Sequence, residues 1–471
     1  MAAAISSTGS GGVDVNAIVT ALMAVERLPI KKLDTKETSE NAKISAYGLV
    51  KSQVASFQAT LTSLGSTTSS KFSAFKATSS DATTLSGTAD TTAAAGIYTL
   101  NVTTLAQSQK LVAAGKTSKT TAISDGAATV ITFDLGTISG GTLTAGVYTG
   151  ATYTSGGTVI APITIDGTNN TLEGIRTAIN AANIGVTASI VNDGSGTPYR
   201  LALSSNSSGV ANSIKITTSG GDGTINTLLA HDPGGLPAAQ HLNQTVAAQN
   251  AVFDVNGISV SKASNTVTDA VEGVALTLSK ETTVPVTLTI ARDTTAVTDA
   301  ATAFVKSFND MYNGIKNSTA FNSKSALEGD STLRSFMSQL RVIITGTVTG
   351  GTLTSLYQAG ITSNIDGTLS LDSSTLNSAM ATNFSDVAHL FNSATGFATA
   401  FDTLATTTLG AGGTIPARIT SFQSNISRIG VERTSLEARM KTIEANYRAQ
   451  FSNLNMLLAS LNSTSSYLSL Q

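Results

Sequence analysis

The chain has 471 residues, of which 12% are charged and 5% aromatic, and 28 Lys and Arg against 30 Asp and Glu give a net charge of −2. This balance lacks the positive excess of a DNA- or RNA-binding protein, and no run of about 20 apolar residues could span a membrane. The chain contains no cysteine, which excludes disulfides, thiolate catalysis and cysteine-type zinc sites.

The first predicted helix begins after Asp14, which is placed to cap it, and Pro29 should end the helix or restart it as a new first turn. Its apolar face is formed by Val15, Ile18, Val19, Leu22 and Val25. The preceding residues, MAAAISSTGSGG, lack the basic and apolar segments of a secretory signal peptide. We interpret them as a leader of small residues, which is either an export signal or a tail without a function.

Helical sequence continues, so that residues 13–78 are predicted to be helical. Between Leu33 and Leu64 the apolar residues step by 4, 3, 4 and 3 positions, which is typical of a coiled-coil seam. The seam residues are Val50, Val54, Phe57, Leu61 and Leu64.

Residues from about 80 to 293 are predicted to form mainly strands and turns. The stretch 96–106 alternates in strand fashion, 251–261 is a hairpin around Asn256-Gly257, and 273–290 continues in strands. An insertion at about 113–244 begins with a Thr-, Gly- and Ala-rich stretch (117–160) that we expect to form strands and loops. It continues as strand, helix and strands, and the buried face of its helix is formed by Leu172, Ile175 and Ile179.

From residue 295 onward the pattern is helical again, with a hairpin-like piece around Asp366-Gly367. The predicted helix at 297–315 has an apolar stripe of Val297, Ala301, Phe304, Phe308, Met311 and Ile315. From Ile419 to Leu461 the spacing indicates one long helix meant to pack on other helices, although Arg433 stands where an apolar seam residue is due. Helices at both ends thus flank a β-rich middle. We expect the opening helix to pack on the C-terminal helix of the same molecule, or otherwise on further copies or a partner fibre.

Five stretches in order resemble one known family, the bacterial flagellar filament cap or FliD family, also called hook-associated proteins of the distal end. They are 9–33, 93–111, 248–280, 327–341 with 356–380, and 451–471. The resemblance implies an α+β multidomain fold, in which terminal coiled-coil-like helices form a leg and a helical domain and two β-rich head domains are inserted. The implied parts are a leg (1–40 and 436–471), a helical domain (41–80 and 294–435), an inner head domain (81–112 and 245–293) and an outer head domain (113–244).

The implied function is that of a structural assembly factor. Members of the family form an extracellular, oligomeric cap at the distal end of the flagellum, which promotes insertion and polymerisation of exported flagellin and prevents its leakage. The implied partners are further copies in a pentamer-like ring, flagellin, hook–filament junction proteins, the type III export apparatus and an export chaperone at the C-terminal helix. The sequence does not determine whether the ring has four, five or six subunits. The residues that the resemblance places in contact with filament or partners are Val15, Ile18, Leu22, Val25, Ile443, Tyr447, Phe451, Leu454, Leu458, Leu461, Tyr467 and Leu468.

Catalytic and metal-binding patterns are not apparent in the sequence, so we expect no enzyme, cofactor or metal site. The three histidines, His231, His241 and His389, form no H-E-x-x-H pattern, and neither a P-loop nor a G-x-S-x-G motif occurs. The alternative to a filament cap is a secreted surface adhesin that binds a host glycan or mucin through residues 113–244.

Overall fold

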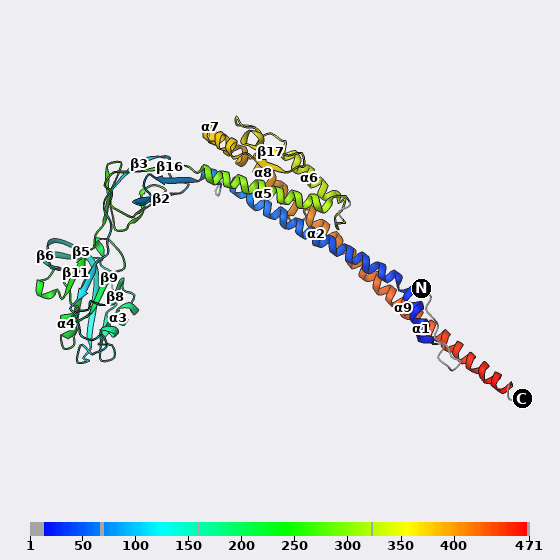
Figure 1. The fold of residues 1–471 in the computed structure, drawn as a ribbon, viewed down its shortest axis with the longest axis horizontal. Helices are drawn as coiled ribbons and strands as arrows, with labels where there is room; N and C mark the ends of the chain where they lie inside the picture. The colour runs from blue at the N-terminus through cyan, green and yellow to red at the C-terminus, as the bar shows by residue number, and fades with distance from the viewer. Residues whose placement is uncertain (1–13, 66–69, 159, 322–323, 469–471) are drawn as a thin grey trace. The chain divides into compact units, whose positions relative to one another are not determined.

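The computed structural model describes residues 14–65, 70–158, 160–321 and 324–468 (Figure 1). It divides into two units: one contains the described residues up to Phe72 and from Thr294 onward, and the other is Ser73–Asp293. The first is helical and the second is rich in β-strands. The chain therefore has the α+β fold with long terminal helices and an inserted β-rich part that its sequence predicts.

The first unit is built around three long helices. Its helices are α1 (Val15–Glu26), α2 (Leu28–Gly65), α5 (Thr294–Thr319), α6 (Ser331–Ile344), α7 (Ser373–Asn392), α8 (Phe397–Leu409) and α9 (Thr414–Leu468). A 3-10 turn, η4 (Leu356–Ala359), leads into the hairpin of β17 (Ile361–Ser363) and β18 (Leu369–Leu371), which packs on α5. Figure 1 shows α2 and α9 side by side over much of their length.

An aromatic cluster forms the centre of this unit. The ring of Phe57 on α2 lies 5.7 Å from those of Phe304 and Phe308 on α5 and 5.5 Å from that of Phe401 on α8, measured between centroids. We call the cluster around these rings, which extends along α9 to Phe422, the body core, and the helices around it the helical body. The predicted seam of α2 and the predicted stripe of α5 are buried in it, which confirms both.

The start of the chain follows the sequence prediction in part. The Asp14 carboxylate accepts a hydrogen bond from the backbone N–H of Ala17 (3.0 Å), α1 ends at Glu26, and α2 restarts with Pro29 in its first turn. The prediction of helix up to residue 78 is wrong. α2 ends at Gly65, and Phe75–Ser79 forms strand β1 because its backbone hydrogen-bonds to β16 in the second unit.

The second unit contains two hydrophobic clusters, each between sheets. The inner cluster lies between the sheet β1-β16-β3-β12-β13 and the sheet β14-β15-β2. The turn between β12 and β13 is the predicted Asn256-Gly257 turn, with both residues at positive φ. The strands are β1 (Phe75–Ser79), β2 (Leu85–Ala89), β3 (Gly96–Thr104), β12 (Ala251–Val255), β13 (Ile258–Lys262), β14 (Thr266–Val271), β15 (Val274–Leu278) and β16 (Val286–Arg292).

The outer cluster includes the predicted helix stripe of Leu172, Ile175 and Ile179 on α3. One sheet has the order β10-β5-β6, with β7 paired to β5, and the other has the order β11-β4-β9-β8. The elements are β4 (Lys110–Ala113), β5 (Thr129–Thr144), β6 (Val147–Ser155), β7 (Ile163–Ile165), α3 (Leu172–Ala181), β8 (Val186–Asn192), β9 (Tyr199–Ser205), β10 (Ser213–Gly220), α4 (Thr224–Leu229) and β11 (Leu242–Val246). The Thr-, Gly- and Ala-rich stretch thus forms strands and loops, as predicted.

Candidate functional site at the terminal helices

The opening helix packs on the C-terminal helix of the same chain. Val19 and Met23 of α1 and Met440 of α9 are buried against one another. Half-buried apolar side chains surround them, namely Val15, Ile30, Ile443, Tyr447 and Phe451. We call these eight residues the leg core. The interpretation that the two terminal helices pack together within one molecule is confirmed.

Polar contacts hold the rim of the leg core. The Tyr447 hydroxyl donates a hydrogen bond to the Glu26 carboxylate (3.1 Å), and Arg448 donates one to the Asn16 side chain (2.8 Å). Arg27 forms an ion pair with Glu444 at 3.7 Å. The Glu26 carboxylate raises the pKa of the Tyr447 phenol, because the phenol must give up this hydrogen bond when it ionises beside a negative charge. These contacts fix how α1 and α9 are oriented around a small apolar core. They add little to its stability, because exposed ion pairs contribute little.

The predicted contact residues divide into groups with different surroundings. Val15, Ile443, Tyr447 and Phe451 belong to the leg core, and Ile18, Leu22 and Leu458 are half-buried. Val25, Leu454 and Leu461 are exposed, by 64%, 41% and 57% respectively. Tyr467 and Leu468 lie at the end of α9, and their side chains are outside the described part of the structure.

The residues of α1 that are buried against α9 differ by one position from the contact residues that the sequence analysis predicted. The residues that face α9 are Val15, Val19 and Met23, spaced four apart, whereas the candidate set followed Val15, Ile18 and Leu22. Periodicity could not separate the two because α1 is apolar on most of its faces. Val19, Met23, Ile30 and Met440 were missed as site residues, although Val19 lies on the predicted apolar face of α1 and Met440 on the predicted seam of α9.

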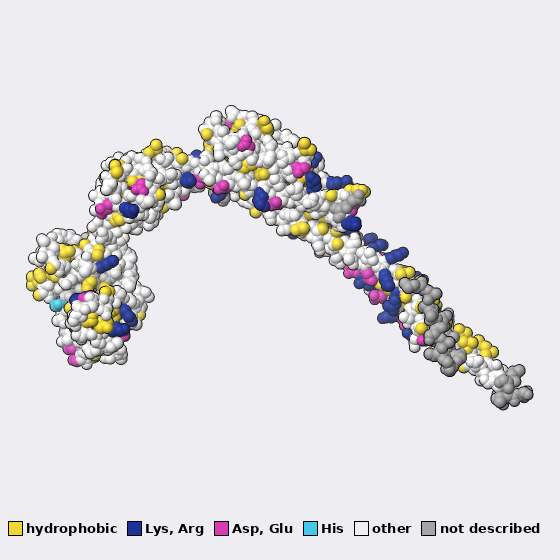
Figure 2. All heavy atoms as spheres, in the orientation of Figure 1, with side chains coloured by type: hydrophobic (Ala, Val, Ile, Leu, Met, Phe, Trp, Pro, Cys, Tyr) yellow, Lys and Arg dark blue, Asp and Glu magenta, His cyan; other side chains and the backbone are white. Residues whose placement is uncertain are grey.

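Beyond the leg core, α9 presents an uncovered apolar stripe. Leu454, Leu457 and Leu461 are exposed and Leu458 is half-buried; we call these four the leg stripe. Figure 2 shows hydrophobic side chains gathered along this end of α9. The sequence carries no charged side chain from residue 449 to 471, so no charge interrupts the stripe. Such a helix face is suited to packing against another helix.

Neither a metal cluster nor a membrane-spanning helix is found among the described residues. No three of their His, Asp or Glu side chains come together in a way that could hold a metal ion. None of the helices within the described ranges is long and apolar enough to cross a membrane. The leg core and the leg stripe form the candidate functional site because they combine a buried contact between the terminal helices with an exposed apolar helix face.

Comparisons with known proteins match the chain from end to end. Family models for the N-terminus and the C-terminus of flagellar hook-associated protein 2 match residues 11–109 and 248–463, and a flagellin hook IN motif matches 152–207. The flagellar hook-associated protein 2 of Escherichia coli K12 is 35% identical, over 100% of this chain and 98% of its own length. The B-type protein of the same name from Pseudomonas aeruginosa PAO1 is 30% identical, over 96% of this chain and 94% of its own.

A solved structure matches both units. The crystal structure of the flagellar cap protein FliD, domains D1-D2-D3, from Escherichia coli is similar with a TM-score of 0.65 and 34% identity. The match covers 80% of this chain and 99% of the solved one.

Proposed function

The chain belongs to the flagellar hook-associated protein 2 (FliD) family, and from this membership we propose how it works as the cap at the distal end of a bacterial flagellar filament. The observation that carries the function is the similarity to the solved FliD cap protein across both units. The protein is extracellular and acts in filament assembly. The names of the matched relatives give no support to the adhesin alternative.

We propose that copies of the chain assemble into a pentamer-like ring whose leg stripes enter the growing end of the filament. The stripe supports this because it is apolar, free of charge and uncovered in the described part of the chain. Flagellin subunits arriving under the ring would be confined there and inserted rather than lost to the medium. The proposed work is steric, as in a structural assembly protein.

The contact residues remain a proposal. The exposed members of the set, Val25, Leu454 and Leu461, are those that a filament subunit or a neighbouring copy could reach directly. Hook–filament junction proteins and the type III export apparatus are further proposed partners. We propose that an export chaperone covers the leg stripe before secretion, since an exposed apolar helix face is a liability in a crowded cell.

The first experiment deletes the gene and compares flagellin in the medium with filaments on the cells. We expect bare cells and abundant free flagellin. Normal filaments on the deletion strain would contradict the proposed function.

A second experiment addresses the leg. Leu457→Asp places a negative charge on the leg stripe. The control variant, Ser452→Asp, adds the same charge to α9 but away from the stripe, about 200° around the helix axis from Leu454. In the complemented deletion strain we expect Leu457→Asp to release flagellin and abolish motility, while Ser452→Asp restores swimming. Equal swimming by both variants would refute the role of the stripe while leaving the cap function standing.

A further inference from the structure

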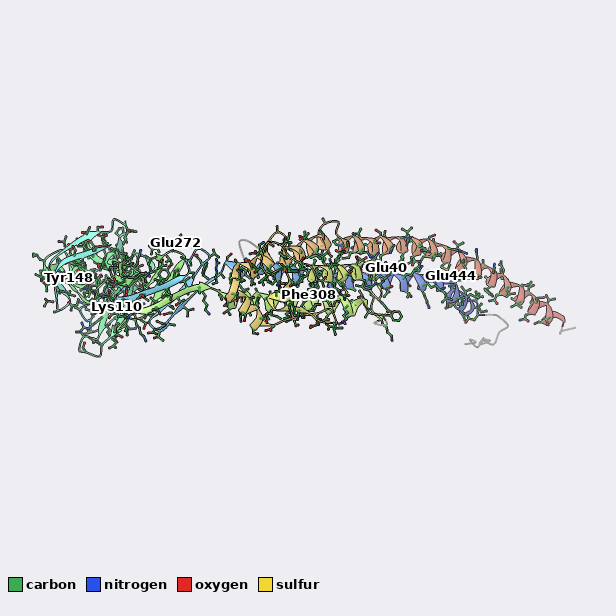
Figure 3. The ribbon with its side chains drawn as sticks, turned by 90° about the horizontal axis from the view of Figure 1, so that it is seen from above. Glu40, Lys110, Tyr148, Glu272, Phe308 and Glu444 are labelled. Carbon is green, nitrogen blue, oxygen red and sulfur yellow. The ribbon has the colours of Figure 1, made fainter. Side chains whose placement is uncertain are left out.

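The second unit contains a junction between the sheets around its inner cluster and those around its outer cluster, which we call the inner and outer sheets. The chain crosses this junction twice, at residues 107–109 and 247–250, and neither crossing contributes a residue to either cluster. Lys110, where the first crossing enters β4, is labelled in Figure 3. The two crossings pair with each other, because the N–H of Gln107 donates to the carbonyl of Gln249 (2.8 Å) and the N–H of Gln249 donates to that of Gln107 (3.0 Å). Two paired crossings alone leave the outer sheets free to rotate about the line that the crossings form.

The loop after β9 binds both crossings from the outer side. The N–H of Gly209 donates a hydrogen bond to the carbonyl of Gln107 in the first crossing (3.1 Å). The N–H of Val210 donates one to the side-chain oxygen of Asn250 in the second crossing (3.0 Å). The loop is therefore tied to the crossings by its backbone, in a conformation that both crossings specify.

The same loop also reaches a part of the inner sheets that belongs to neither crossing. This part is the turn between β13 and β14, where the carbonyl of Ala263 accepts a hydrogen bond from the hydroxyl of Ser208 (2.6 Å). The side chain of Asn265 holds the turn in place, since it accepts from the N–H of Ala106 (2.7 Å) and donates to the carbonyl of Ala106 (2.9 Å). A contact away from the line of the crossings is the kind that opposes rotation about that line.

Gly209 allows the loop to approach the turn closely. It is buried, and its φ of +96° lies in the left-handed region that favours glycine. A Cβ added to it would lie 2.5 Å from the Cβ of Ala263 and 2.8 Å from its Cα. Any side chain at this position must therefore push the loop and the turn apart.

We propose that Ser208, Gly209 and Val210 form a clamp that fixes the orientation of the outer sheets relative to the inner sheets. A small junction without an apolar core allows relative motion by default, so a specific device is needed to suppress it. The clamp supplies this device because it adds a third attachment to the two crossings. The second unit then moves as one body, in agreement with its grouping as a single compact unit. The inference concerns the chain itself and does not depend on the proposed function.

The test measures distances between spin labels in the full chain. Because the chain has no cysteine, labels can be placed on introduced cysteines alone. The pair Ser189→Cys on β8 and Thr289→Cys on β16 spans the junction, and the pair Ser189→Cys and Thr217→Cys on β10 lies within the outer sheets; all three positions are exposed. We expect both pairs to give narrow distance distributions. Gly209→Ala should widen the spanning distribution at least about twofold and leave the pair within the outer sheets unchanged, which also shows that those sheets remain folded.

Gly194→Ala is the matched control. Gly194 lies in the loop between β8 and β9 and also has a positive φ (+72°), but a Cβ added to it would meet no atom within 4 Å. It therefore adds strain to the outer sheets without touching the inner ones, and the spanning distribution should stay narrow. Ser208→Ala combined with Asn250→Ala removes two hydrogen bonds of the clamp without adding a side chain, and it should widen the spanning distribution as well.

Two results would overturn the proposal. One is a spanning distribution that is already wide in the chain with an intact clamp. The other is a spanning distribution that Gly209→Ala changes no more than Gly194→Ala does.

Discussion

Replacing Phe57 should strongly destabilise the helical body while leaving the stability of the second unit unchanged. Phe57 of α2 is almost completely buried, and its ring meets those of Phe304, Phe308 and Phe401 at centroid distances of 5.5 to 5.7 Å. Phe57→Ala removes the ring at the point where α2, α5 and α8 meet. The lost burial, the cavity and the lost ring contacts together cost about 3–5 kcal/mol.

A loss of this size is comparable with the whole stability of many domains, which is about 5–15 kcal/mol. Unfolding by urea, followed by the helical circular dichroism signal, measures it, because most helical residues lie in the first unit. Phe321→Ala is the matched control, since Phe321 is 85% exposed, and it should change the unfolding free energy by less than about 0.5 kcal/mol. A loss below about 1 kcal/mol for Phe57→Ala, or equal losses for both variants, would refute the argument that these rings hold the body together.

Three further predictions concern other parts of the chain. Val19→Asp should detach α1 from α9, because it puts a charge into the leg core, and trypsin should then cut faster after Arg27. Burial lowers the pKa of His231 to about 4 from an ordinary value of 6.5, so the folded state keeps a neutral imidazole that the unfolded chain protonates. The outer sheets should therefore lose stability as the pH falls from about 6.5 toward 4, by up to about 3 kcal/mol, and His231→Gln should remove this slope in urea unfolding followed by hydrogen exchange of residues 213–246. Asp330→Ala should cost about 1–2 kcal/mol in urea unfolding, because Asp330 caps α6 through the N–H groups of Thr332 and Leu333 and pairs with Arg418.

Each of these has a control. Val25→Asp introduces the same charge at an exposed position of α1 and should leave cleavage after Arg27 unchanged. His241→Gln changes a less buried histidine nearby and should keep the pH slope. Asp366→Ala removes an aspartate from an exposed turn and should cost less than Asp330→Ala. Faster cleavage in the Val25 variant, a pH slope that survives loss of His231, or equal costs for the two aspartates would contradict the respective reasoning.

The sequence by itself determined most of the helices and strands, because that information is largely local. The apolar seam of α2 and the long helix α9 repeat every three or four residues, and Asn256-Gly257 supplies the positive φ angles of a tight hairpin turn. The alternation of helical and strand-like zones also predicted that the β-rich part is inserted into a helical one.

Only the tertiary structure decided which faces meet. Val19 and Met23 face α9, rather than Ile18 and Leu22, because Met440 and its neighbours occupy that side of α1. Phe75–Ser79 forms a strand instead of the predicted helix because it pairs with β16, more than 200 positions away.

Arg433 shows most clearly what the sequence pattern cannot predict. In the sequence it interrupts the apolar seam of α9, but in the structure it forms ion pairs with carboxylates about 400 positions earlier in the chain. Periodicity describes the surface that one helix offers. The partner that covers this surface is set by contacts between residues that are distant in sequence, and no local pattern contains that information.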